Sequence, residues 1–163
     1  MAVDTVEKLL VEELKDIYSA EKQITRALPK MAKNATSDQL RQAFETHLEE
    51  TKGQIKRLER VFEILGKTAS AKTCKAMQGL IEEGSEQMQE LEGEILDAAL
   101  IAAAQKVEHY EMASYGSVRT WAQLLGKKDV ADLLQQTLTE EGETDHKLTE
   151  LSGKINKEAQ RAA

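Results

Sequence analysis

Two glutamates lie in the middle of the chain at positions where a packed helix normally carries apolar side chains. Glu108 and Glu111 belong to the stretch 97–125, in which apolar residues recur at alternating steps of three and four. That spacing places side chains along one stripe of a helix. The stripe consists of Ile101, Ala104, Glu108, Glu111, Tyr115, Val118, Ala122 and Leu125. Because a buried carboxylate must be protonated, paired or bound to a metal, we expect the chemistry of the protein here.

Equivalent positions in the other predicted helices also carry polar side chains. Glu21 interrupts the apolar stripe of the first helix, and Glu141 interrupts that of the last. In the second helix, His47 lies close to the stripe and Glu50 lies at its edge. Counting from the predicted turns places all of these residues at about the same height as Glu108. The sequence therefore predicts a polar layer in the middle of a bundle.

This layer is predicted to bind two divalent metal ions. Lys and Arg fall almost entirely outside the stripes, so the carboxylates would repel one another and raise one another's pKa. Two divalent ions would supply four compensating positive charges. A site rich in carboxylates and poor in nitrogen favours Fe or Mn over Zn. The predicted ligands are Glu21, His47, Glu50, Glu108, Glu111 and Glu141.

The same residues also have a structural interpretation. Glutamates at the edge of a stripe can bend toward water or pair with a Lys on the next helix, and His47 can pack without binding a metal. Tyr18 and Tyr115 lie about one turn from Glu21 and Glu111, where they could bond to a carboxylate, relay electrons or simply pack. The roles of two further acids, Glu140 and Asp145, stay open, and the sequence assigns no catalytic residue.

Four long helices and one shorter helix must position these side chains. The patterns predict long helices over 4–33, 36–65, 97–125 and 130–155, and a shorter helix over 73–92. The short first turn makes the first two helices antiparallel, and the shorter helix is a crossover that lets the third long helix run parallel to the second. The polar tail after Asn156 is expected to fray. These elements predict an all-α, ferritin-like four-helix bundle forming a single domain over 1–163.

Composition restricts the possible partners and compartments. A chain of 163 residues is long enough for one domain with a real core. The net charge of −7 disfavours nucleic acid and offers no basic patch for a membrane surface. The sequence shows neither a signal peptide nor a membrane-spanning run, and its single Cys74 suits a reducing compartment, so we expect a cytoplasmic protein. Apolar residues outside the main stripes, such as Val6, Val61 and Ile64, predict a homodimer.

Four segments carry a resemblance to a known family. They are YSAEKQITRALPKMAK, HLEETKGQIKRLERVFE, KAMQGLIEEG and AALIAAAQKVEHYEMASYG. Together they closely resemble the bacterial YciF/YciE-type stress proteins of the ferritin-like superfamily, over about residues 5–151. The resemblance implies stress-induced cytosolic helical bundles, often dimeric, with a suggested di-iron site and no assigned reaction.

The chain departs from better-known di-iron bundles, which carry Glu-x-x-His on two helices. Here Gly53 follows Glu50 at that offset, and Thr144 follows Glu141. The pair Glu108-x-x-Glu111 does resemble the third helix of rubrerythrin-like proteins. Two classes of function therefore stay open. One is a di-metal protein that stores iron or acts on oxygen or peroxide; the other is a non-enzymatic stress or interaction protein with structural or degenerate carboxylates.

Overall fold

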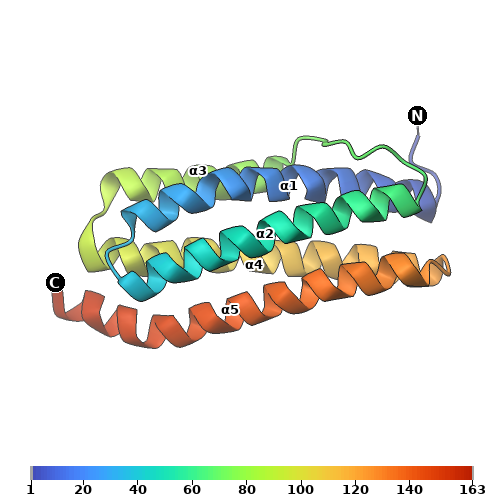
Figure 1. The fold of residues 1–163 in the computed structure, drawn as a ribbon. Coiled ribbons are helices and arrows are strands. Elements are labelled where there is room, and N and C mark those ends of the chain that lie inside the picture. The colour runs from blue at the N-terminus through green and yellow to red at the C-terminus, as the bar shows by residue number, and fades with distance from the viewer. Residues whose placement is uncertain (1, 163) are drawn as a thin grey trace.

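The computed structural model describes residues 2–162, and over this range the chain forms α-helices and no strands (Figure 1). The four long helices lie side by side, and a shorter one packs along one half of the bundle, which confirms the predicted all-α bundle with a crossover. In chain order the helices are α1 (Val6–Asn34), α2 (Asp38–Ile64), α3 (Lys75–Glu90), α4 (Gly93–Leu124) and α5 (Lys128–Ala162). Within residues 2–162, none of these helices has the length and apolar character needed to cross a membrane.

Local signals in the sequence determine where the long helices begin and end. The hydroxyl oxygens of Thr5 and Ser37 accept backbone N–H groups in the first turns of α1 and α2. Gly66 and Gly126 follow the C-terminal ends of α2 and α4 with φ values of 65° and 68°. This left-handed conformation costs glycine little, so both residues let the chain turn sharply.

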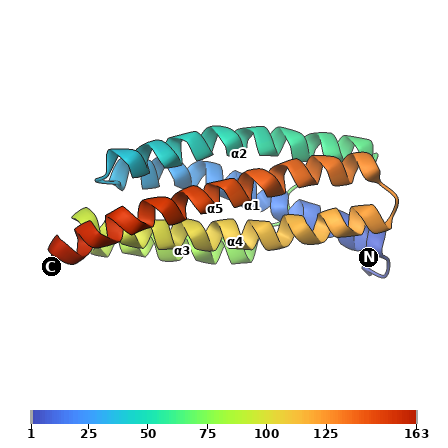
Figure 2. The ribbon, with the colours of Figure 1, turned by 90° about the horizontal axis from the view of Figure 1, so that it is seen from below.

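The connections set the directions of the helices. A short turn makes α1 and α2 antiparallel, and α4 and α5 are joined in the same way (Figures 1 and 2). The segment 65–74 and α3 carry the chain back along the bundle, so α4 runs parallel to α2. As a result, α3 lies against α1 and α4 over only part of their length.

A buried carboxylate on α4 fixes the first turn. Asp97 is 2% exposed, and its two oxygens accept the backbone N–H groups of Thr36 and Ser37, each at 2.8 Å. Both oxygens of this carboxylate therefore have backbone donors.

The buried face of α2 is rotated relative to the predicted stripe. His47 and Gln54 are 4% and 0% exposed, whereas Leu48 and Ile55 lie only partly buried at the edge. This rotation turns Val61 into the core at 0% exposure, so the prediction that Val61 contributes to a surface patch was wrong. The rotated face brings His47 Nε2 to 2.8 Å from Glu108 Oε1 across the core.

The last helix is longer than the apolar pattern suggested. We expected fraying after Asn156, but α5 continues to Ala162. Ile155 and Ala159 are 1% and 6% exposed, so the final turns still pack on the bundle. Burial of these small and branched side chains explains the extension.

Two apolar clusters form the core. One contains Ile24, Phe44 and Leu148, and the other contains Leu14, Phe62 and Leu134. The buried residues between them along each long helix are polar, so the predicted polar layer divides the core into two halves.

Candidate metal centre

Five buried side chains from all four long helices meet in the polar layer. Glu21 and Glu141 are 0% exposed, Glu108 and Glu111 are 1% exposed, and His47 is 4% exposed. Glu108 and Glu111 are three residues apart on α4, so they face the same side of that helix. Five of the six ligands predicted from the sequence therefore lie together in the core.

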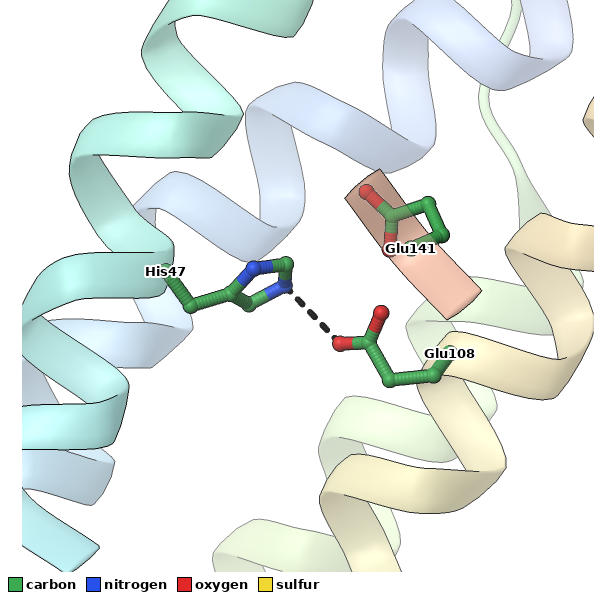
Figure 3. A group of neighbouring side chains, drawn as sticks. All are labelled: His47, Glu108 and Glu141. Atoms are coloured by element: carbon green, nitrogen blue, oxygen red, sulfur yellow. Dashed lines mark ion pairs between the residues drawn. The ribbon is translucent and has the colours of Figure 1, made fainter. Parts of the chain in front are cut away.

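These side chains form two groups that share one member. His47, Glu108 and Glu141 each offer a ligand atom, and these atoms lie within 4.8 Å of one another. Glu21, Glu111 and Glu141 form a second group that meets the same limit. Figure 3 shows the first group, in which the imidazole from α2 faces the carboxylates from α4 and α5. Glu141 is therefore common to both groups of potential ligands.

Two contacts hold part of this layer in place. His47 Nε2 lies 2.8 Å from Glu108 Oε1, where the atoms are not aligned as a hydrogen bond but form an ion pair when the imidazole is protonated (Figure 3). The hydroxyl of Tyr115 donates to Glu21 Oε1 at 2.5 Å. Of the roles that the sequence left open for Tyr115, packing in the core and bonding to a carboxylate are both observed.

Most of the remaining polar atoms in the layer lack a partner. Over residues 2–162, both oxygens of Glu111 and Glu141 are buried without a hydrogen bond. The same is true of Oε2 of Glu21 and Oε2 of Glu108, while the ring nitrogens of His47 have ion-pair contacts with Glu108 and Glu50 but no hydrogen bond. Buried polar groups without partners cost free energy and are uncommon in native proteins. Oxygen and imidazole donors of this kind fit Fe or Mn.

Burial and mutual repulsion shift the acid–base properties of the centre. Burial, opposed by the Tyr115 bond, raises the pKa of Glu21 to about 7. Burial and the neighbouring carboxylates raise the pKa of Glu111 well above its usual value. The pKa of Glu141 is raised by burial and by Glu108. Burial opposes protonation of His47, but contacts with Glu108 and Glu50 outweigh it and raise the pKa of the imidazole.

Glu50 lies beside the centre and outside both groups of potential ligands. Its carboxylate is 3.6 Å from His47 Nδ1, and its side chain is 32% exposed. It accepts a hydrogen bond from Thr144 at 3.2 Å, and the contact with His47 lowers its pKa. The rotation of α2 that buries His47 leaves Glu50 at the edge, so its role as a ligand stays a prediction.

Three further polar residues near the layer, Tyr18, Glu140 and Asp145, have partners outside the two groups of potential ligands. Tyr18 donates to Glu59 at 2.8 Å rather than to Glu21. Glu140 accepts two bonds from Arg57, at 3.0 and 2.8 Å, which link α5 to α2. Asp145 lies 3.3 Å from an exposed His109. Sequence patterns could not identify Arg57 as the partner of Glu140, because these two residues are 83 positions apart.

Two cavities of different character reach the centre. One, of about 220 Å³, lies between α1, α3 and α4, and Ile24, Leu80 and Val107 are among its mostly apolar lining residues. The other, of about 500 Å³, lies between α2 and α5 and is lined in part by Glu50, Thr144 and Lys147. His47 and Glu108 border both cavities. Small molecules therefore have an apolar and a polar approach to the same side chains.

Comparison with known proteins identifies relatives over the whole chain. Residues 5–161 match the family model described as a domain of unknown function, DUF892. Protein YciF of Escherichia coli K12 is 50% identical over 166 residues, covering 100% of both chains.

Solved structures agree with these matches. The crystal structure of the E. coli stress protein YciF has a TM-score of 0.92 at 50% identity, covering 95% of this chain and 99% of that one. YcfI of Rhodopseudomonas palustris, suggested to be a structural protein, has a TM-score of 0.88 at 47% identity, covering 91% of this chain and 97% of that one. A protein of Xanthomonas campestris, with a TM-score of 0.78 at 23% identity over 97% of this chain and 98% of that one, shares the fold.

Proposed function

The chain belongs to the DUF892 family, and we propose that it is a ferritin-like protein that binds two Fe or Mn ions between its long helices. Its E. coli relative is a stress protein, and we propose that this chain serves in a stress response by storing iron or by acting on oxygen or peroxide.

The observation that supports this proposal most directly is the shared position of Glu141. One carboxylate common to two ligand groups suits a bridge between two ions. Two divalent ions carry four positive charges, which balance the charges of ionised Glu21, Glu108, Glu111 and Glu141. They would also give partners to the orphaned oxygens of Glu111 and Glu141.

The side chains have separate roles in this proposal. His47, Glu108 and Glu141 would hold one ion, and Glu21, Glu111 and Glu141 would hold the other. Bound iron would supply the redox chemistry. Tyr115 keeps Glu21 oriented through its hydrogen bond, and the apolar clusters exclude water from the two sides of the layer along the bundle axis.

A second candidate is a structural role without metal. The contacts from His47 to Glu108 and from Tyr115 to Glu21 hold part of the layer together without an ion. In this alternative, protonation of the remaining carboxylates would remove their repulsion, as their raised pKa values allow. The suggestion that YcfI is a structural protein agrees with this role.

Metal stoichiometry tests the proposal. Anaerobic titration of the metal-free protein with Fe(II) or Mn(II), followed by calorimetry and elemental analysis, should give two ions per chain. His47→Ala and Glu111→Gln should each leave one ion, because each affects one group. Glu141→Gln should weaken both sites by at least tenfold.

The matched control is Glu143→Gln, which removes an exposed carboxylate from the same helix and should retain two ions. Wild-type protein that binds no ion at millimolar metal would exclude the di-metal proposal and favour the structural role.

We also propose that the protein is a homodimer. Val6 and Leu9 of α1 and Ile64 of α2 are 36%, 37% and 40% exposed, and Leu124 of α4 is 73% exposed. These residues lie at the end of the bundle where α1 begins and α2 and α4 end. Light scattering at micromolar concentration should give a mass near twice 18.2 kDa, and a monomer would contradict this proposal.

A further inference from the structure

The cavity between α1, α3 and α4 is apolar along most of its wall. Its lining includes Ile24, Leu28, Leu80, Ile81 and Val107. The cavity has a volume of about 220 Å³ and is partly open to solvent. Since an apolar cavity of about 150 Å³ holds a benzene molecule, this one has room for about nine non-hydrogen atoms.

The two ends of the cavity differ in charge. Ile24, His47 and Glu108 are buried and form its inner end, while Arg26 and Lys30 are exposed and form its outer rim. Arg26 and Lys30 are four residues apart on α1, so their side chains lie on the same face.

Neither rim cation has a partner. Across residues 2–162, neither Arg26 nor Lys30 forms an ion pair or a side-chain hydrogen bond, although acids outnumber bases in the chain by 29 to 22. Among the described lining residues, the single carboxylate is Glu108, at the inner end. A free cationic pair above an apolar cavity is complementary to a molecule with one anionic group and an aliphatic tail.

We propose that this cavity binds a medium-chain aliphatic monocarboxylate, with its carboxylate at Arg26 and Lys30 and its tail extending toward His47 and Glu108. A tail of about eight carbons matches the available volume. The binding itself needs no metal. We further infer that the bound carboxylate is a substrate whose tail reaches the metal centre. This part rests on the proposed function, in which His47 and Glu108 are ligands of one ion.

Calorimetric titration of metal-free protein with octanoate tests the binding. Octanoate should bind at least tenfold more tightly than octan-1-ol, which has the same tail without the charge. Affinity should rise about fourfold for each CH₂ group from butanoate to octanoate and level off beyond it, when the cavity is full.

Substitutions locate the site. The double variant Arg26→Ala, Lys30→Ala should lower octanoate affinity at least tenfold and leave that for octan-1-ol unchanged. Its matched control is Lys33→Ala, an exposed lysine of the same helix outside the cavity, which should bind as wild type. Ala27→Leu and Ala103→Leu fill the cavity from α1 and α4 and should each abolish binding. Ala102→Leu, at an exposed neighbouring position, should not.

The outcomes separate this inference from the proposed function. No octanoate binding to the metal-free protein at millimolar concentration, equal affinity for the acid and the alcohol, or loss of binding in Lys33→Ala would overturn it. If the protein takes up no metal, the di-metal proposal is excluded. Octanoate binding in that case would still support the cavity as a carboxylate site. Because Ala27→Leu and Ala103→Leu act from different helices, binding that persists in either folded variant contradicts the assignment.

Discussion

Asp97 and Glu111 are buried carboxylates on the same helix, and they differ in what surrounds them. Asp97 accepts the backbone N–H groups of Thr36 and Ser37, so each of its oxygens has a donor. Glu111 has two buried oxygens without any partner in the described chain, and burial and nearby carboxylates raise its pKa. Asp97 stabilises the turn between α1 and α2, whereas the oxygens of Glu111 accept no hydrogen bond in the described chain and could bind a metal ion.

A structural carboxylate and a potential metal ligand therefore differ in how many of their oxygens already accept a hydrogen bond. A buried acid that only stabilises the fold has its oxygens satisfied by the protein. The polar layer instead concentrates unpartnered atoms from four helices at one height. Burial alone would not distinguish the two, because Asp97 and Glu111 are 2% and 1% exposed.

The largest effect expected from a single substitution is at Asp97, whose carboxylate oxygens both accept backbone hydrogen bonds. Asp97→Ala removes two charge-assisted hydrogen bonds and should lower the free energy of unfolding by about 3 to 5 kcal/mol. Urea denaturation of the metal-free protein measures it. The control, Glu94→Ala, removes an exposed acid from the first turn of α4 and should change stability by about 0.5 kcal/mol or less. Equal effects of the two substitutions would mean that Asp97 does not hold the turn.

Metal should stabilise the unsatisfied region. Mn(II) at a hundred times its dissociation constant should raise the free energy of unfolding by about 3 kcal/mol for each site, which corresponds to a rise in melting temperature of about 5 to 10 °C for each site. In Asp97→Ala the free energy of unfolding should be lower than in the wild type, but Mn(II) should raise it by the same amount, because the turn that Asp97 stabilises lies outside the metal centre. Glu141→Gln should lose most of this increase. If saturating metal leaves the melting temperature unchanged, the carboxylates of the polar layer do not bind metal ions.

Removing one carboxylate should stabilise the metal-free protein. Because the pKa of Glu111 is raised from its ordinary value of 4.5, the folded state binds more protons than the unfolded chain. Stability therefore falls as pH rises above about 4.5. Glu111→Gln should avoid this loss and gain about 1 to 3 kcal/mol at pH 7, and the gain should vanish near pH 4.5.

The comparison variant for this substitution is Glu108→Gln, which should instead lower stability because it removes the closer of the two ion-pair partners of His47. Urea unfolding of both variants across this pH range measures the two effects. A gain for Glu111→Gln that does not depend on pH would contradict the role of repulsion and burial.

The smallest effect is expected at Glu50, which lies between the two kinds of environment. Its carboxylate is partly exposed and accepts a bond from Thr144, so Glu50→Gln should change Mn(II) affinity by about threefold or less. Calorimetric titration of this variant beside Glu141→Gln measures it. A change above tenfold would show that Glu50 moves into the centre when metal binds.

Helical periodicity predicted the bundle and the positions of Glu21, Glu108, Glu111 and Glu141 because it reports which face of each helix is buried. It could not predict the rotation of α2, which depends on how His47 meets Glu108 across the core. The role of Asp97 was also hidden, since its partners lie 60 and 61 residues away. The bond from Tyr115 to Glu21 spans 94 residues and was only one of several possibilities.

The crossover helix α3 has a consequence for access to the interior. Of its 16 residues, only Met77 and Gly84 are buried, so its detachment exposes less apolar surface than that of any long helix. Local opening of a protein begins where such contacts are fewest. The amide hydrogens of α3 should therefore exchange with solvent faster than those in the middle of α4. The apolar cavity beneath α3 can then open and close while the four long helices remain folded.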